Sequence, residues 1–324
     1  MSREDIIAIL GPDLTKVSEL LRTTLHTEVP LLSSINDGLL EHSGKMLRPL
    51  VAVAMARAAG GGLATDDSIR YAAAVEILHN ATLLHDDVAD EASTRRGAPT
   101  VFSAWGPTPA VLVGDFWLAA AVDLLSDGPD LKWIVSTFSR TLKDLAEGEM
   151  LQQQKAFMAD TTEEDYLRIV FCKTASLFVS ACTSAVKSVH GPQEYFDAAA
   201  AYGRALGIAF QIKDDIMDYS PSPDSGKPAG IDLSEQKITL PLLGALKESP
   251  REAEIRALVK GIPSHPENCA AVRDFVLAEG GLDYAMAKLE DYIAEAVDAL
   301  AVLPDSPEKD ILAAVAKYNA LRTR

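Results

Sequence analysis

Two acidic clusters in the chain share the pattern D-D-x-x-D. Each directly follows a strongly apolar segment, 69–84 in one case and 205–212 in the other. Residues four apart on a helix differ by about 40° in direction, so the first and third aspartates of a cluster project from one face. Carboxylates at the ends of buried helices repel one another and lose hydration unless cations balance their charge. The first cluster is Asp86, Asp87 and Asp90, and the second cluster is Asp214, Asp215 and Asp218.

The cation that best fits such carboxylates is a hard divalent ion. Mg²⁺ uses one or two protein carboxylates and fills its remaining positions with water and substrate phosphates. A single cluster of this kind is equally well explained as a solvated helix end. Two copies, each after an apolar helix and before a long polar loop (91–107 and 220–236), favour a metal site.

Basic residues near these clusters stand out because the chain is otherwise acidic. Fixed cations together with bound metal are the usual means of binding a diphosphate, with Arg as a bidentate fork and Lys as a point charge. Taken singly, each of these residues is more simply a solvated surface charge. The candidates are Lys45, Arg48, Arg95, Arg96, Lys173, Lys227 and Lys237.

A histidine accompanies the first cluster. His79 precedes Asp86 by seven residues, which places it on the acidic face of the same helix, one to two turns deeper. A lone histidine is more often a hydrogen-bonded core residue, but this position favours a ligand contact. Glu76 and His79 also form a Glu-x-x-His step, as in di-iron helical bundles. Such a site needs two of these steps and the sequence has one, so that interpretation is rejected.

Long helices must position these residues. Apolar residues recur at helical spacing through most of the chain, and Gly, Pro and Asp clusters separate the segments. Thr65 predicts the start of a helix that ends near Asp90. Strands are expected to be absent or trivial. We expect further long helices at 107–126, 129–158, 162–189 and 191–219, and shorter helices over 237–322.

The composition is that of a globular protein, with 48% of the 324 residues hydrophobic and 24% charged. A formal net charge of −17 argues against nucleic acid or an anionic membrane as a partner. Three cysteines without metal-ligand spacing fit a reducing compartment. The N-terminal apolar run breaks at Gly11-Pro12, and no uncharged apolar window approaches the ~18 residues of a membrane span. We therefore expect one cytoplasmic, all-α domain over residues 1–324, with no membrane span.

Several motifs, in order from about residue 40 to 245, resemble those of the trans-isoprenyl diphosphate synthases, the polyprenyl synthetase family. They are GKMLRP, LLHDDVADEASTRRGAPT, GEMLQQ, KTASLF, and FQIKDDIMD followed by GKPAGIDLSEQKITLPLL. The resemblance implies a single-domain bundle of long helices around a deep central cavity (the isoprenoid synthase type), usually as a homodimer. It also implies a Mg²⁺-dependent transferase, in which three Mg²⁺ ions held by the two clusters bridge the diphosphate of an allylic substrate.

The resemblance assigns roles to individual residues. The metal ligands are Asp86, Asp90 and Asp214, with Asp87, Asp215 and Asp218 in support. The isopentenyl diphosphate site comprises Lys45, Arg48, His79 and Arg96. The allylic diphosphate site comprises Arg95, Lys173, Thr174, Gln211, Lys227 and Lys237.

The implied reaction expels diphosphate from the allylic substrate and joins the allylic cation, head to tail, to the double bond of isopentenyl diphosphate. Thr174 and Gln211 place oxygen dipoles near the cation, and the departed diphosphate takes the proton. Ala81 and Thr82 are small and lie just before the first cluster, so we expect an all-trans product of geranylgeranyl length or longer. Candidates for the floor of the cavity are Phe116, Trp117 and Leu118.

Two other functions remain open at this point. A terpene cyclase of related fold ionises the same kind of substrate, but it usually has one D-D-x-x-D cluster and lacks the basic isopentenyl diphosphate site. A non-catalytic subunit of a two-component synthase tends to lose one cluster, whereas both are intact in this chain.

Overall fold

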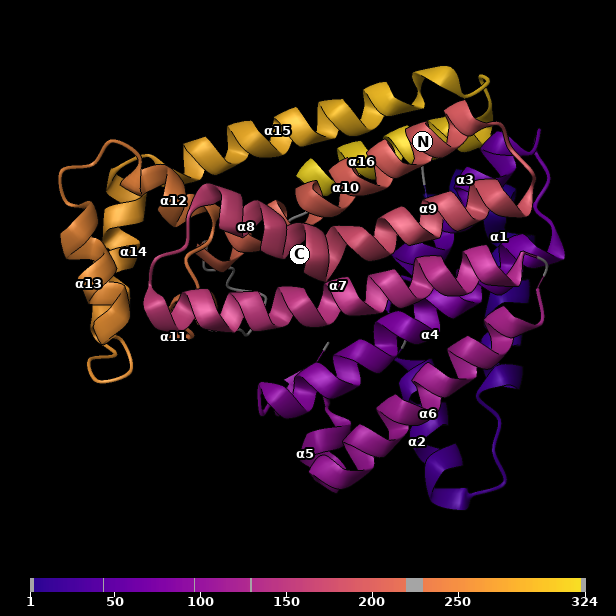
Figure 1. The fold of residues 1–324 in the computed structure, drawn as a ribbon, viewed down its shortest axis with the longest axis horizontal. Helices are drawn as coiled ribbons and strands as arrows, with labels where there is room; N and C mark the ends of the chain where they lie inside the picture. The colour runs from indigo at the N-terminus through magenta and orange to yellow at the C-terminus, as the bar shows by residue number, and fades with distance from the viewer. Residues whose placement is uncertain (1–2, 43, 96, 129, 220–229, 322–324) are drawn as a thin grey trace. The chain divides into compact units, whose positions relative to one another are not determined.

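The computed structural model describes residues 3–42, 44–95, 97–128, 130–219 and 230–321, and these are helical almost throughout (Figure 1). The expected all-α class is confirmed, since the strands in these ranges are two pairs of residues. The chain divides into two compact units. Unit 1 comprises residues 1–139, 180–200 and 302–312, and unit 2 comprises residues 140–179, 201–301 and 313–324.

Unit 1 contains the N-terminal helices and a small hairpin. α1 continues through Gly11 and Pro12, where the sequence showed a break in its apolar run. The elements are α1 (Arg3–Thr24), α2 (Pro30–Glu41), α3 (Leu47–Ala59), α4 (Asp66–Ala89), β1 (Thr94–Arg95), β2 (Ala98–Pro99), α5 (Val101–Trp105) and α6 (Pro107–Ser126).

The central helix of unit 1 is α4, which carries the first cluster at its C-terminal end. Its N-terminus is fixed by a capping box, in which the Thr65 side chain accepts from the Ser68 backbone N–H and Ser68 returns the bond. The middle of the helix is buried on every side, and α4 packs against α6, α3 and α1. The predicted start at Thr65 and end near Asp90 are confirmed.

The later helices include those of unit 2, where α13 and α14 lie side by side and α12 packs on α15 (Figure 1). The predicted helices at 129–158 and 191–219 correspond to α7 and α10. The elements are α7 (Leu131–Met158), α8 (Glu163–Val170), the π-helical turn η1 (Phe171–Ala175), α9 (Ser176–Ser188), α10 (Gln193–Tyr219), α11 (Ile231–Ser234), α12 (Leu240–Leu246), α13 (Glu252–Gly261), α14 (Asn268–Ala278), α15 (Gly281–Ala299), the 3₁₀ turn η2 (Leu300–Val302) and α16 (Pro307–Leu321).

The predicted helix at 162–189 corresponds to α8, η1 and α9, which follow one another without a break, but its middle, Phe171–Ala175, is π-helical rather than α-helical. π-Helical turns of this kind occur frequently at functional sites. Two glycines let neighbouring helices approach this turn closely. A Cβ at Gly148 of α7 would overlap Cys172, and a Cβ at Gly207 of α10 would collide with the backbone of Ala175. α7 and α10 therefore pack closely on η1 at these two glycines.

Replacing Gly207 by alanine is expected to lower the free energy of unfolding by about 1–3 kcal/mol, because the added methyl group meets backbone that must move. Activity should fall as well, since η1 carries Lys173 and Thr174. Urea unfolding and a rate assay test both effects. Gly38→Ala on α2 is the matched control, because no atom lies within 4 Å of a Cβ at that position. Equal stability of the two variants would contradict the prediction.

Two helical segments have the length and hydropathy of a membrane span, which the sequence analysis did not expect. They are Pro107–Ser126 and Glu163–Ser188. In the second, 78% of the apolar window is buried inside the protein, as in the core helix of a globular protein. In the first, 39% is buried. Length and composition alone do not establish a span, because buried core helices share both properties.

Candidate functional site

The first cluster lies at the C-terminal end of α4. Asp86 and Asp87 are in the last turn, Asp90 is the C-cap, and no basic residue is present in that turn. The negative end of the helix dipole disfavours carboxylates at this position, so their presence does not serve the stability of the helix. Asp86 is half-buried and Asp90 is exposed, whereas Asp87 is buried. The three carboxylates therefore have different surroundings.

The Asp87 carboxylate forms an ion pair with Arg95. The Arg95 Nε donates to Asp87 Oδ1 at 2.7 Å, and burial raises the pKa of Asp87 while Arg95 opposes that rise. The hairpin of β1 and β2 holds Arg95 over the end of α4, with Arg95 paired to Ala98. The turn uses Gly97 at a φ of +79°, a value that favours glycine. Arg95, predicted to bind the allylic diphosphate, is thus anchored by the second aspartate of the first cluster.

A His–Asp pair that the sequence did not predict lies beside the first cluster. His85 Nε2 is 3.3 Å from Asp115 Oδ1 on α6. Gly114 makes room for the imidazole, because a Cβ there would overlap the ring. The Asp115 side chain is 62% exposed, so solvent screens this contact and it contributes little free energy.

Three residues predicted for the isopentenyl diphosphate site, Lys45, Arg48 and His79, lie in unit 1. The fourth, Arg96, is outside the described residues. Lys45 is exposed and lies between Gly44 and Met46, which both have positive φ angles, just before α3. Arg48 is in the first turn of α3 and is half-buried. His79 is half-buried on α4.

The residues predicted to set product length also lie in unit 1. Ala81 is completely buried, and the half-buried Thr82 donates its hydroxyl to the His79 carbonyl at 2.8 Å. Trp117 is buried, and its indole N–H donates to Asn36 Oδ1 at 2.9 Å. The Asn36 amide in turn donates to the Leu25 carbonyl, which fixes the position of Trp117.

The second cluster lies in the last turns of α10, in unit 2, again with no basic residue in the last turn. The Asp218 side chain accepts hydrogen bonds from the start of α11. Its carboxylate accepts the backbone N–H groups of Ile231 at 3.1 Å and Asp232 at 3.2 Å. Asp218 therefore caps α11 and ties it to the end of α10. Lys227, predicted for the allylic site, falls outside the described residues.

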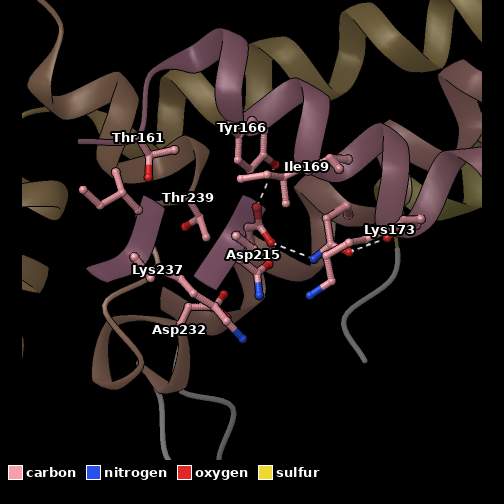
Figure 2. A pocket seen from close by; sticks show the side chains of 14 residues that line it. Thr161, Tyr166, Ile169, Lys173, Asp215, Asp232, Lys237 and Thr239 are labelled. Atoms are coloured by element: carbon pink, nitrogen blue, oxygen red, sulfur yellow. Dashed lines mark hydrogen bonds between the residues drawn. The ribbon is translucent and has the colours of Figure 1, made fainter. Parts of the chain in front are cut away.

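A cavity of about 130 Å³ opens beside Asp215 (Figure 2). Its walls come from α7, α8, η1, α10, α11 and the segment before α12. Four residues predicted for the allylic site line it together: Lys173, Thr174, Gln211 and Lys237. The remaining lining residues are Gln152, Ala156, Thr161, Tyr166, Ile169, Val170, Asp215, Asp232, Ile238 and Thr239.

Asp215 is buried, and hydrogen bonds occupy both of its oxygens. Tyr166 donates its hydroxyl to Oδ2 at 2.7 Å, and Gln211 donates Nε2 to Oδ1 at 2.9 Å (Figure 2). Thr174 donates Oγ1 to the Gln211 amide oxygen at 3.0 Å. Burial and the charge of Asp232 raise the pKa of Asp215 well above its ordinary value, while the two hydrogen bonds oppose the rise. Burial and the charge of Asp215 also raise the pKa of Tyr166.

Each lysine of the cavity is held by a glutamate. Lys173 forms an ion pair with Glu149 of α7, and Lys237 forms one with Glu235. Asp232 lies beside Lys237 (Figure 2). Burial and the charge of Asp218 raise the pKa of Asp232 to about 6, and Lys237 opposes this rise. The cavity thus contains two cations and further acids in a partly enclosed space.

Comparison with known proteins identifies the family to which the chain belongs. A model of the polyprenyl synthetase family matches residues 29–276, which is most of the chain. The chain belongs to the polyprenyl synthetase family. As a member of that family it is a transferase of the trans-isoprenyl diphosphate synthase type, and the predicted family and enzyme class are confirmed.

Relatives of this polyprenyl synthetase match over its whole length. Octaprenyl diphosphate synthase from Haemophilus influenzae is 38% identical, with 99% of this chain and 98% of that protein covered. The structure of a polyprenyl synthase from Caulobacter crescentus, complexed with calcium and isoprenyl diphosphate, matches with a TM-score of 0.91 and 34% identity over 100% and 98% of the two chains. A decaprenyl diphosphate synthase from Rhodobacter capsulatus matches with the same TM-score and identity, over 100% of each chain.

Polyprenyl synthetases use a divalent metal, and the donor set of this chain fits one. Within the described residues, no three His, Cys, Asp or Glu side chains are close enough to hold an ion on their own. That is expected for Mg²⁺, which takes one or two protein carboxylates and completes its shell with water and phosphate oxygens. Asp86, Asp90 and Asp214 are the carboxylates predicted for this role, and each is half-buried or exposed near the C-terminal end of its helix.

Four residues at this cavity were not predicted from the sequence: Tyr166 and Asp232 line it, and Glu149 and Glu235 form ion pairs with its lysines. Asp232 and Glu235 belong to the polar loop at 220–236, and Glu149 belongs to the motif GEMLQQ, so both segments carried a signal. Tyr166 carried none. It is seven residues before Lys173, but η1 changes the helical phase between them, so the spacing does not indicate that both line one cavity.

Proposed function

We propose that the chain condenses isopentenyl diphosphate with an allylic diphosphate, head to tail, to give an all-trans polyprenyl diphosphate of octaprenyl to decaprenyl length. The family and the prenyltransferase class are already established. The names of the relatives, octaprenyl and decaprenyl diphosphate synthase, support the long product. The small side chains at Ala81 and Thr82, just before the first cluster, support it independently.

The observation that carries the proposal is the cavity beside the second cluster. It brings together two lysines, a threonine hydroxyl and a glutamine amide, beside a helix end that carries three carboxylates. Lysines and metal-binding carboxylates suit a diphosphate, and hydroxyl and amide oxygens suit a carbocation. A terpene cyclase is less well supported, because the chain also carries Lys45, Arg48 and His79 for a second diphosphate.

In the proposed reaction, Lys173 and Lys237 bind the allylic diphosphate and stabilise the negative charge that develops as it leaves. A bound divalent metal would supply further positive charge to stabilise the leaving diphosphate. Asp86, Asp90 and Asp214 would hold the metal, and we expect three ions. Lys45, Arg48 and His79 bind isopentenyl diphosphate. Arg96 and Lys227 keep their predicted roles as binding residues, although they lie outside the described residues.

The walls of the cavity protect the allylic cation. Ile169, Val170 and Ile238 line it and exclude water, which would otherwise quench the cation. Thr174 directs its hydroxyl oxygen toward the cation, and the Gln211 amide oxygen accepts the Thr174 hydroxyl at 3.0 Å. The proton lost after the new carbon–carbon bond forms passes to the departed diphosphate, so no side chain is needed as a base.

We also propose that the chain acts as a homodimer in the cytoplasm. α6 exposes an apolar surface, with the side chains of Leu112 and Val122 61% and 51% exposed. A second copy of the chain covering this surface would remove it from water. The three cysteines are free thiols, which supports a reducing compartment.

Incubating the purified protein with Mg²⁺, farnesyl diphosphate and isopentenyl diphosphate tests the function. Mass spectrometry of the products is expected to show polyprenyl diphosphates of about eight to ten isoprene units. These are the lengths that the names of the octaprenyl and decaprenyl relatives give. The control omits isopentenyl diphosphate and should leave the primer unchanged. A hydrocarbon product would establish a cyclase, and the absence of any product would favour a non-catalytic subunit.

A further inference from the structure

The second aspartate of the second cluster points into the interior of unit 2. Asp215 is 2% exposed, whereas its neighbours in the cluster, Asp214 and Asp218, are half-buried. Both Asp215 oxygens already accept hydrogen bonds, one from Tyr166 and one from Gln211. A carboxylate in this position is poorly placed to bind metal, although the sequence analysis assigned it a supporting role there. Its contacts indicate a different task.

Asp215 determines which way the Gln211 amide faces. The Gln211 NH₂ group donates to Asp215 Oδ1, and the Gln211 amide oxygen accepts from Thr174, so the hydrogen bond to Asp215 fixes the orientation of the amide. The Thr174 hydroxyl then donates a hydrogen bond to that oxygen, and the lone pairs of Thr174 Oγ1 point away from Gln211. Thr174 lines the cavity, so these lone pairs are available to a bound substrate.

We propose that Tyr166 and Asp215 are positioning residues that act through Gln211 to fix the direction of the Thr174 hydroxyl dipole. The negative end of that dipole faces the allylic carbon from which diphosphate departs. A dipole fixed in advance needs no reorganisation as the cation forms, which is the basis of electrostatic catalysis. The inference rests on the proposed function, since it requires an allylic cation in this cavity.

The first cluster repeats the arrangement. Asp87 is 4% exposed and binds Arg95, while Asp86 and Asp90 are more exposed. On a helix the second aspartate projects about 100° from the first, which turns it away from the face shared by the first and third. In each unit this inward aspartate holds a side chain predicted to contact substrate. The likeness of two separate sites supports a positioning role for Asp215.

Tyr166→Phe tests the proposal, because it removes one hydroxyl and nothing else. With farnesyl diphosphate and isopentenyl diphosphate, kcat is expected to fall about 10–100-fold, as for other residues that orient a catalytic group. The KM values and the Mg²⁺ concentration for half-maximal rate should stay within about twofold of the wild type, since no ligand of metal or phosphate is lost. Titration calorimetry with inorganic diphosphate and Mg²⁺ should likewise give an unchanged Kd.

The matched control is Tyr284→Phe. Tyr284 also donates its hydroxyl to a carboxylate, Glu163 at 2.8 Å, in the same unit, but it does not line the cavity. This variant should keep the wild-type kcat. A normal kcat in Tyr166→Phe, or an equal loss in Tyr284→Phe, would overturn the inference. A wild-type protein that makes no elongated diphosphate would instead overturn the proposed function.

A double-mutant cycle separates positioning from a general structural effect. If Tyr166 acts through Thr174, then adding Tyr166→Phe to Thr174→Val should cause little further loss of kcat. Multiplicative losses would show that the two residues act independently, against the proposal. Asp215→Asn serves as a second variant should Tyr166→Phe unfold. It is expected to lower kcat with an unchanged Mg²⁺ dependence, and a shift to higher Mg²⁺ would show that Asp215 is a metal ligand.

Discussion

Replacing Asp86 or Asp214 by alanine is expected to lower kcat by about 10²–10⁴-fold, because each change removes a carboxylate proposed to bind the metal and with it several kcal/mol of transition-state stabilisation. The fold should not suffer. Both residues lie near the C-terminal ends of their helices, where the helix dipole disfavours negative charge. Removing the charge should therefore raise the free energy of unfolding slightly, by about 0.3–1 kcal/mol.

Steady-state rates over a range of Mg²⁺ concentrations, together with thermal unfolding, measure both effects. Asp298→Ala is the control, since Asp298 is an exposed aspartate near the C-terminal end of α15. It should share the small stability change and keep full activity. If Asp86→Ala or Asp214→Ala retained near-normal turnover with an unchanged Mg²⁺ requirement, the assignment of these residues to the metal would fail.

Placing phenylalanine at Ala81 or Thr82 is expected to shorten the product, because the growing chain must pass the side chains just before the first cluster. The first condensation should survive, since the diphosphate-binding groups are not changed. Ala81 is fully buried, so the added ring also costs about 1–3 kcal/mol of stability by overpacking. Thr82 is only half-buried, so Thr82→Phe is the cleaner variant. Mass spectrometry of the products gives the length distribution.

Thr82→Val is the matched control for this experiment. It removes the hydroxyl that bonds to the His79 carbonyl without adding bulk. Its product distribution should match that of the wild type, which attributes any shortening to size. A wild type that stops at farnesyl diphosphate, or phenylalanine variants with unchanged products, would refute the view that these positions limit the chain.

Helices set by local signals were predictable from the sequence. Thr65 marks the start of α4 because its side chain satisfies a backbone N–H that the helix leaves open, and this rule needs no tertiary information. The hairpin that carries Arg95 was not predicted, and the segment 91–107 was taken for an irregular loop. Strands of two residues are too short to leave an alternating pattern.

The candidate site was predictable in its residue types and less so in its contacts. Helical geometry shows that Asp87 and Asp215 point away from their neighbours, but it does not show what they meet. Arg95 and Tyr166 reach these aspartates from other elements, so their roles depend on tertiary packing. The π-helical turn was not predicted either, and the close approach of Gly148 and Gly207 to it is likewise a matter of tertiary packing.

The glutamates that hold Lys173 and Lys237 bear on product release. An ammonium group left bare in a half-buried cavity would retain the departing inorganic diphosphate. Glu149 and Glu235 form ion pairs with the two lysines, so if these lysines bind diphosphate as proposed, each ammonium would keep a counter-anion when the diphosphate leaves. A chain-elongating enzyme discards one diphosphate for every isoprene unit that it adds. These counter-anions would therefore aid repeated turnover by helping inorganic diphosphate to leave after each condensation.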